Sequence, residues 1–584
     1  MFNKYYQDEL TYLRDLGREF SEAYPDAAQF IGERGSDPDV ERLLEGFSFL
    51  TARIRQKLDD ELPEFTHAMI EMFWPHYLRP IPSMSILKFD PLPQATKEAR
   101  FVRKGVELDS LPVDGTACRF RTAYDTWLAP VTIQSASMRL ESPPSLKLRF
   151  KLTDGVGPDK IGVDAIRIFL SGEPAVTRAI YLCLRRYVKK VIIRPTEGGE
   201  PGKQIILGPD TIKAVGFDQE DSLLPYPKTS FLGYRTLQEY FTFPEKFMFL
   251  DLKADRIPEL GQARSFEFLF ELNRTPEDMP AIDTTNFNLN CVPIVNLFDH
   301  EGDPIRVDHK HAEYKLRPGG NNYRHYDVYT IDNLSGHVKG LAKPREYKPF
   351  FGFRHSIQSS SDEGLFFRSR VEESVTTEGT DVYVSLHTQE DAADVPAVET
   401  ISSDLTCTNR NLASRLRIGD ISVATSSSPE FARFKNLTPP TNTVPPPVGK
   451  DIFWRLLSHL SLNYLSLASV DTLRSILQLY HFRTRVDRQA EQALKRMLDG
   501  IKSIEAKPAT RMLEGAPIRG ISIRMELEED NFGGEGEIYL FSAMINEFFA
   551  LYVTLNSFSQ LTVKGLKYGE IHQWAPRIGT RTIL

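Results

Sequence analysis

Residues 37–91 read DPDVERLLEGFSFLTARIRQKLDDELPEFTHAMIEMFWPHYLRPIPSMSILKFDP, and within this stretch the apolar pattern changes from helical to extended. In its first half, apolar side chains recur every three or four residues, which predicts an amphipathic helix. Asp37 and Pro38 suit the start of that helix, because Asp caps helices and proline is tolerated in the first turn. From Met84 onward apolar and polar residues alternate, which predicts a half-buried strand. The stretch therefore predicts a helical region followed by a β-rich one.

The residues before this stretch predict a further helix. Five side chains there recur at spacings of three and four, which places them on one helical face; they are Tyr6, Leu10, Leu13, Leu16 and Phe20. Pro63 interrupts the second stripe, and a third short helix is expected from Phe65 to Phe73. Three prolines between Trp74 and Ser83 cannot lie inside a helix. The helical region is therefore predicted to cover residues 1–82.

The middle of the chain is predicted to be rich in strands. Segments such as SLKLRFKL (145–152) and AIRIFLSG (165–172) alternate apolar and polar residues, and Gly and Pro punctuate them. We expect one or two β-rich domains here, with limits at 83–290 and 291–437. Residues 181–195 can form a helix or two strands, because their periodicity does not decide between the two.

The last part of the chain returns to helices. The proline-rich segment 438–450 favours extended backbone and is interpreted as a linker. Amphipathic helices are expected in DIFWRLLSHLSLNYLSLAS (451–469) and DTLRSILQLYHF (471–482), then a one-sided strand at 521–527 and an apolar helix at 540–551. The predicted class is a multi-domain α+β protein with an N-terminal helical region, a β-rich middle, and C-terminal helices plus a small α/β unit (451–584).

Composition excludes several classes of protein. The 584-residue chain has a formal net charge of -8, which opposes general binding to nucleic acid because phosphate contacts require a basic surface. No apolar run reaches the length of about 18 residues that predicts membrane insertion, and the opening residues lack the apolar core of a secretory signal. The four cysteines form no CxxC pair and are interpreted as buried thiols. We expect a cytoplasmic protein.

Familiar catalytic and cofactor motifs are missing from the sequence. It contains no GxxxxGK[ST] phosphate loop, no GxSxG elbow and no HExxH pair. GGEG at 533–536 follows a predicted strand and is interpreted as a plain turn. We therefore expect no catalytic residue, no cofactor and no metal.

The segment NLFDHEGDPIRVDHKHAEY (296–314) is the densest polar cluster. On a strand, His309 and His311 would face the same side, which suits a metal ion and makes a metal-dependent hydrolase the rival hypothesis. The spacing matches no usual zinc framework, and DHEGDP has the composition of a tight hairpin connection. We interpret the cluster as structural. Its candidate ligands are Asp299, His300, Glu301, Asp303, Asp308, His309 and His311.

The aromatic segment QEYFTFPEKFMFLDL (238–252) also allows two interpretations. Its rings have the chemistry to stack on nucleic-acid bases. Its acids, Glu239, Glu245 and Asp251, oppose a phosphate backbone. The segment is therefore interpreted as a packed structural element.

Blocks along nearly the whole chain resemble the TssF family of type VI secretion proteins, also named ImpG or VasA. The opening YYQDELTYLRDLGREFSEAYPDAA (5–28) is similar to the family's N-terminal signature, and the stretch from Asp37 to Met84 continues it. Further similar blocks are GYRTLQEYFTFPEKFMFLDL (233–252), NCVPIVNLFDHEGDPIRVDHKHAEY (290–314), LLSHLSLNYLSL (456–467), YLFSAMINEFFALYVTLNSFSQL (539–561) and WAPRIGTR (574–581). Residues 353–436 carry no such block.

The resemblance implies a structural subunit of a secretion baseplate and no enzyme activity. Two TssF copies would join one TssG to form a wedge, which would contact TssK and TssE and close around a VgrG hub. The baseplate would dock on the TssJLM membrane complex, so the cytoplasmic protein would be recruited to the inner membrane. The alternative is a wedge protein of a phage-type or other contractile injection baseplate.

Two regions are expected to contact partners. The N-terminal helices are assigned to the contact with TssG and a second TssF copy, because three short helices bury limited area among themselves. The opposite reading, in which the helical stripes pack only on each other, stays open for the second helix. The C-terminal α/β unit is assigned to contacts between neighbouring wedges. The candidate interface residues are Tyr6, Leu10, Leu13, Phe47, Leu50, Ile54, Ile523, Met525, Phe541 and Phe548.

Overall fold

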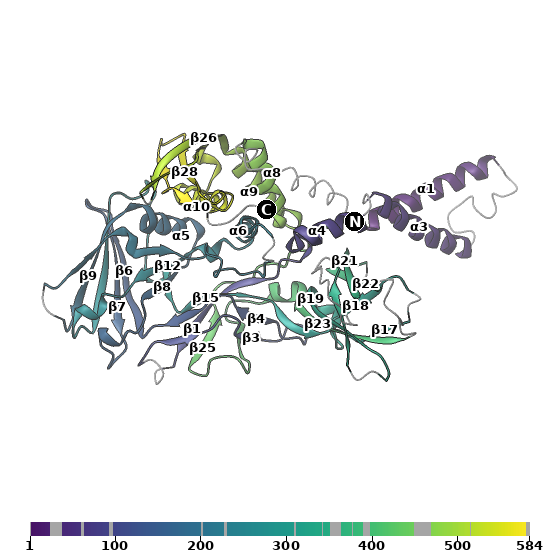
Figure 1. The fold of residues 1–584 in the computed structure, drawn as a ribbon, viewed down its shortest axis with the longest axis horizontal. Coiled ribbons are helices and arrows are strands. Elements are labelled where there is room, and N and C mark those ends of the chain that lie inside the picture. The colour runs from purple at the N-terminus through teal and green to yellow at the C-terminus, as the bar shows by residue number, and fades with distance from the viewer. Residues whose placement is uncertain are drawn as a thin grey trace.

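The structure is a computed structural model in which a helical hairpin projects from a larger body of sheets and helices (Figure 1). Helices and strands both contribute substantially and form several sheets, which confirms the predicted multi-domain α+β class. The residues that the structure describes are 2–23, 38–59, 63–92, 97–199, 202–226, 230–308, 311–340, 343–350, 364–375, 378–388, 398–448, 469–513 and 515–579.

The N-terminal region is helical, as the sequence predicts. Helices α1 (Phe2–Ala23) and α3 (Pro38–Asp59) pack side by side as the projecting hairpin (Figure 1), and α4 (Pro63–Phe73) leads into the body. A short 3₁₀ turn, η2 (Pro75–Leu78), follows at the first of the expected prolines. The base of the hairpin also touches the body, since Arg53 lies 3.8 Å from Glu372.

A six-stranded sheet forms the centre of the body. It joins strands from distant parts of the chain: Cys291–Val295 pairs with both Met84–Pro91 and Arg119–Thr122, and Ala432–Asn436 pairs with the other edge of Met84–Pro91. The limit expected at residue 290 therefore falls inside one sheet. Periodicity predicts strands but not their partners. In spatial order the strands are β24 (Ile421–Ala424), β3 (Glu107–Ser110), β4 (Arg119–Thr122), β15 (Cys291–Val295), β1 (Met84–Pro91) and β25 (Ala432–Asn436).

Two antiparallel sheets and two helices complete one end of the body (Figure 1). Residues 181–195 hold both the end of a helix and one strand, because α5 (Pro174–Leu182) runs through a π-helical turn into β9. Helix α6 (Leu232–Thr242) is buried along its whole length. The five-stranded sheet contains β10 (Ile205–Leu207), β9 (Val188–Glu197), β13 (Ser265–Leu272), β7 (Ser145–Leu152) and β6 (Val131–Arg139), and the four-stranded sheet β11 (Ile212–Ala214), β12 (Phe249–Lys253), β8 (Ala165–Leu170) and β14 (Phe287–Leu289). A separate pair is formed by β2 (Arg100–Val102) and β5 (Thr126–Leu128).

An eight-stranded sheet with its own apolar clusters lies below the hairpin (Figure 1). The segment DHEGDP does not close a hairpin, which corrects the prediction: the strands before and after it lie one after the other along the same neighbour, β23. The strands are β16 (Phe298–Glu301), β17 (Ile305–Val307), β23 (Glu399–Thr408), β19 (Asp327–His337), β20 (Arg345–Pro349), β21 (Leu365–Glu373), β22 (Thr380–Thr388) and β18 (Tyr314–Leu316).

The proline-rich segment lies against the central sheet. The hydroxyl oxygens of Thr438 and Thr441 accept hydrogen bonds from the backbone N–H groups of Ile86 and Met84, each at 3.0 Å. Val444 exchanges backbone hydrogen bonds of 2.8 and 2.9 Å with Ile81. Proline supplies no backbone donor, so the intervening threonines provide the contacts that hold these residues in place.

The C-terminal unit packs onto the body through an apolar helix. The predicted strand and helix lie within β27 and α10, and α10 contacts both α5 and α6 (Figure 1). The helix expected at 451–469 falls almost entirely outside the described residues. The elements are α8 (Val470–Tyr480), α9 (Arg488–Asp499), β26 (Ile501–Leu513), β27 (Ala516–Leu527), α10 (Glu535–Leu551), β28 (Ser557–Gly565), β29 (Ile571–Gln573) and β30 (Arg577–Ile578).

Candidate partner interface

Helix α3 carries a stripe of exposed apolar side chains on the projecting hairpin. These side chains recur at spacings of four, three and four, so they share one face of the helix. Large apolar side chains gathered on one exposed face mark a surface that another molecule covers. The stripe, called the α3 stripe below, consists of Leu43 (73% exposed), Phe47 (56%), Leu50 (62%) and Ile54 (62%).

The opposite face of α3 faces its partner helix. Ser48 and Ala52 are fully buried, and Arg55 donates a hydrogen bond of 2.6 Å to Glu9 of α1. Small residues in the seam let the two helices approach closely. Helix α1 therefore covers the Ser48 face of α3 and leaves the α3 stripe exposed.

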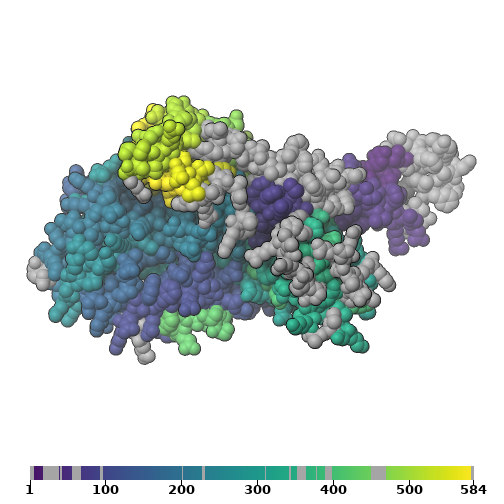
Figure 2. All heavy atoms as spheres, in the orientation of Figure 1, coloured from purple at the N-terminus to yellow at the C-terminus, as the bar shows by residue number. Residues whose placement is uncertain are grey.

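The three predicted interface residues of α1 are less exposed than the α3 stripe. Leu10 is 6% exposed, and Tyr6 and Leu13 are half-buried. Among the α1 side chains that the structure describes, the large apolar ones that are exposed are Tyr12 and Leu16. In the space-filling view the described part of the hairpin forms the purple surface on the right (Figure 2).

The four C-terminal candidates lie inside the molecule. Ile523 is 3% exposed, and Met525, Phe541 and Phe548 are completely buried. Phe548 packs against Phe231, with ring centroids 5.8 Å apart. Sequence periodicity identified the apolar face of this unit correctly, but that face packs on the protein's own core. Any contact between neighbouring wedges must use other side chains of the unit.

Part of the polar cluster at 296–314, interpreted from the sequence as structural, can be placed in the structure, whereas His309 lies outside the described residues. His300 lies with its Nε2 atom 2.9 Å from the carbonyl of Gly319. Asp308 accepts a hydrogen bond from the hydroxyl of Tyr314 at 3.2 Å. Within the described ranges, no three side chains of metal-ligating type are arranged to hold an ion.

The cysteines do not form a reactive thiolate. All four are free and buried, which confirms the interpretation from sequence. Burial raises the pKa of the Cys118 and Cys183 thiols to about 12 and raises the pKa of Cys291 and Cys407 as well. A thiol must ionise to act as a nucleophile, so none of them is poised for catalysis.

The aromatic segment 238–252 encloses a buried ion pair. Glu239 is completely buried, forms an ion pair with Lys246, and accepts backbone hydrogen bonds from Leu223 (2.9 Å) and Leu224 (3.1 Å). Burial alone would raise the pKa of Glu239, but the charges of Lys246 and Arg235 outweigh it and lower the pKa. Both side chains are at most 1% exposed, so we interpret the pair as structural.

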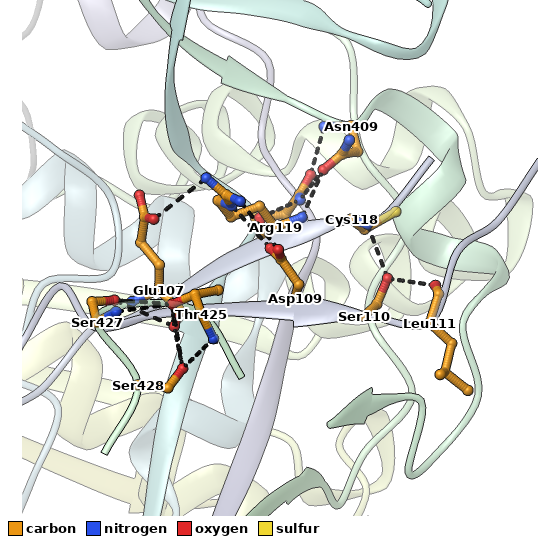
Figure 3. Close-up of polar contacts among 11 residues, drawn as sticks. Glu107, Asp109, Ser110, Leu111, Cys118, Arg119, Asn409, Thr425, Ser427 and Ser428 are labelled. Atoms are coloured by element: carbon orange, nitrogen blue, oxygen red, sulfur yellow. Dashed lines mark hydrogen bonds and ion pairs between the residues drawn. The ribbon is translucent and has the colours of Figure 1, made fainter. Parts of the chain in front are cut away.

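A polar junction connects the central sheet with the eight-stranded sheet (Figure 3). Asn296 and Asn409 are fully buried. The side-chain amide of Asn296 donates a hydrogen bond of 2.7 Å to the side-chain oxygen of Asn409. The backbone N–H of Asn409 donates one of 2.7 Å to the side-chain oxygen of Asn296. The same Asn409 oxygen accepts from the backbone N–H of Arg119 at 3.1 Å, and Arg119 pairs with Asp109 at 2.9 Å. Buried polar networks of this kind fix how elements sit on one another.

Two buried histidines predict a loss of stability in mild acid. Burial lowers the pKa of His481 and of His572 to about 4. Because these folded-state values lie below the unfolded value of about 6.5, the stabilisation is complete above pH 6.5 and is lost as the pH falls through 4. We expect each histidine to contribute on the order of 3 kcal/mol to this loss, at about 1.4 kcal/mol per pKa unit.

Urea unfolding at pH 7 and pH 4.5 measures this loss. The variants His481→Phe and His572→Phe should each show a smaller difference between the two pH values than the unmodified chain. An unchanged difference in both variants would contradict the assignment. An exposed histidine, His337, serves as the matched control through His337→Phe.

The described residues thus form a multi-domain α+β protein with a projecting helical hairpin, and among them no group of three metal-ligating side chains is placed to hold an ion. The family model "Type VI secretion system, TssF" matches residues 1–581. The chain therefore belongs to the TssF family and is a type VI secretion baseplate subunit, as the sequence resemblance implied.

Individual relatives agree over nearly the full length. The chain is 30% identical to the type VI secretion system component TssF1 of Pseudomonas aeruginosa, covering 99% of this chain and 98% of that protein. It is similar, with a TM-score of 0.75 and 31% identity, to a chain of the TssK-TssF-TssG baseplate subcomplex solved by cryo-electron microscopy, covering 93% of this chain and 99% of that one. A chain of a second solved type VI baseplate complex is similar with a TM-score of 0.68 and 26% identity, covering 100% of this chain and 100% of that one. No described helix is both long and apolar enough to cross a membrane.

Proposed function

We propose that this chain is a non-enzymatic wedge subunit that binds a TssG-type protein through the α3 stripe. The observation that carries the proposal is the stripe itself: four large apolar side chains stand exposed on a hairpin that projects from the body. The solved TssK-TssF-TssG subcomplex holds a chain of similar fold. A helix from a partner would pack on the stripe as a third member of the hairpin.

The energetics require a partner that covers the whole stripe. Burying a large apolar side chain contributes about 1.5–3 kcal/mol, whereas association costs at least about 4 kcal/mol in lost freedom of motion. One covered side chain would not sustain a stable complex, and two would only roughly match this minimum cost. Four covered side chains exceed the cost, and a second copy of this chain on the same partner would add more.

The same proposal places the chain in a larger assembly. Two copies would join one TssG-type subunit, with TssK and TssE as further partners, around a VgrG hub. The assembly would dock from the cytoplasm on the TssJLM membrane complex at the inner membrane. The TssF family match and the type VI baseplate structures favour this system over a phage-type baseplate.

The solution behaviour of the isolated chain tests the stripe as an interface. We expect the chain alone to self-associate, because uncovered stripes of two molecules pack on each other. Co-expression with a TssG-type partner should give a soluble complex of defined mass. Light scattering on both samples measures this. A monodisperse monomer that the partner leaves unchanged would count against the proposal.

A further inference from the structure

A basic cavity of about 210 Å³ lies in the eight-stranded sheet, far along the chain from the α3 stripe. It is bordered by β18, by the turn η9 (Tyr323–His325) and by the start of β22. Its lining residues come from four separate segments. The polar ones are Lys315, Arg317, Tyr323, Arg324, Tyr326, Thr380, Asp381 and Arg410.

Two of the four cations in the cavity are neutralised by carboxylates. Lys315 pairs with Asp381 at 2.5 Å. Arg410 pairs at 2.7 Å with the buried Asp327, which lies behind the cavity wall. Each carboxylate is thus held in place by a cation on another element.

The other two cations, Arg317 and Arg324, have no ion pair among the described residues. Both lie beside the ring of Tyr323, with their guanidinium carbons 5.5 and 5.8 Å from its centre. Arg324 also donates a hydrogen bond of 3.3 Å to the hydroxyl of Tyr323. Four cations against two carboxylates leave the site with two uncompensated positive charges. Both guanidinium groups thus lie beside the same tyrosine ring in the lining of the cavity.

The wall of the cavity also contains an unused hydroxyl group. The Oγ1 atom of Thr380 has no hydrogen-bond partner within the described part of the chain, although this residue is only 5% exposed. A buried hydroxyl without a partner is destabilising. An oxyanion in the cavity would accept its hydrogen, which would satisfy the group and add a third contact beside the two guanidinium groups.

We propose that this cavity binds a phosphate group, either as free phosphate or as the terminal group of a small organic phosphate. A dianion matches the two uncompensated charges, and guanidinium forks bind phosphate oxygens through paired hydrogen bonds. The volume admits a phosphate group but not an entire nucleotide. The proposal does not depend on how the hairpin binds its partner.

Calorimetric titration of the full-length chain with sodium phosphate at constant ionic strength tests the proposal. We expect saturable binding by the unmodified chain. The double variant Arg317→Ala/Arg324→Ala should bind more than about tenfold more weakly, because it loses both charge-assisted contacts. Thr380→Val keeps the shape of the side chain but removes the hydroxyl, and we expect a smaller loss. Arg306→Ala is the matched control, since Arg306 is exposed in the same sheet and does not line the cavity.

Two further titrants distinguish the sources of the phosphate. If glycerol 3-phosphate binds as well as phosphate, the site takes a terminal phosphate group; if only phosphate binds, the site encloses the free ion. Acetate should not compete, since a monoanion leaves one charge uncompensated. Equal binding by the unmodified chain and the double variant, or no binding of either phosphate, would overturn the proposal.

Discussion

Replacing Phe47 and Leu50 by glutamate is expected to abolish binding to a TssG-type partner while the chain stays folded. Both side chains are more than half exposed at the centre of the α3 stripe, and glutamate is a good helix former, so the helix itself should persist. The complex then lacks two buried apolar side chains, whose burial contributes about 4 kcal/mol to the binding free energy. This loss corresponds to a roughly thousandfold weaker affinity. Pull-down from co-expressing cells measures the loss, and circular dichroism checks the fold.

Matched controls separate the stripe from general surface effects. Leu140 and Ile206 are exposed to a similar degree, 60% and 54%, but lie on the body away from the hairpin. Their substitution by glutamate should leave the complex intact. If the Phe47→Glu/Leu50→Glu variant keeps the partner and either control variant loses it, the interface lies on the body and not on the α3 stripe.

The structure also changes which variants are informative. Leu10 lies in the seam between the two helices, so a charge there would disrupt the hairpin before it affects a partner. A deletion from residue 519 would remove Phe541 and Phe548, which are completely buried. Such a chain would expose its own core, so its loss of any partner would have no clear cause.

The substitution Lys246→Met is expected to destabilise the chain by about 3–5 kcal/mol, since it leaves a buried carboxylate without its cation. Glu239 and Lys246 are at most 1% exposed and form an ion pair within the 233–252 block. Chemical denaturation followed by tyrosine and tryptophan fluorescence measures the change. Reduced soluble expression should accompany it, because a loss of this size approaches the whole stability of many domains.

The double variant Glu239→Gln/Lys246→Met tests the cause. Neutralising both partners removes the isolated charge, so the double variant should be more stable than Lys246→Met alone. Lys253→Met is the control: Lys253 lies 3.3 Å from Asp255, but both side chains are about half exposed. Exposed pairs contribute at most about 1 kcal/mol. A loss in the control equal to that of Lys246→Met would show that removing any lysine from this region is destabilising.

The sequence predicted local structure well and long-range pairing poorly. The three N-terminal helices, the strand in β27 and the helix in α10 follow from periodicity, because burial of one face imposes it. The pairing of β15 with β1 and β4 joins residues about two hundred positions apart, and no local pattern records it. For the same reason the DHEGDP segment resembled a hairpin connection, although the flanking strands share β23 as their partner.

Sequence periodicity identified apolar faces but not what covers each of them. The spacing of Phe47, Leu50 and Ile54 identified an apolar face, and only the structure shows that α1 covers the other side of the helix. The same reasoning applied to Met525 and Phe541 identified core residues, because a stripe has the same appearance in sequence whether it packs inside the chain or on a partner. The basic cavity gave no signal at all, since its residues are brought together from segments that are separate in the chain.

Native mass spectrometry of the chain co-expressed with a TssG-type protein tests whether the α3 stripe holds the complex together. The expected result is one stable species that contains two copies of this chain and one TssG-type subunit, and that disappears with Phe47→Glu/Leu50→Glu. Recovery of the chain without the TssG-type protein, or an unchanged complex in the variant, would contradict it.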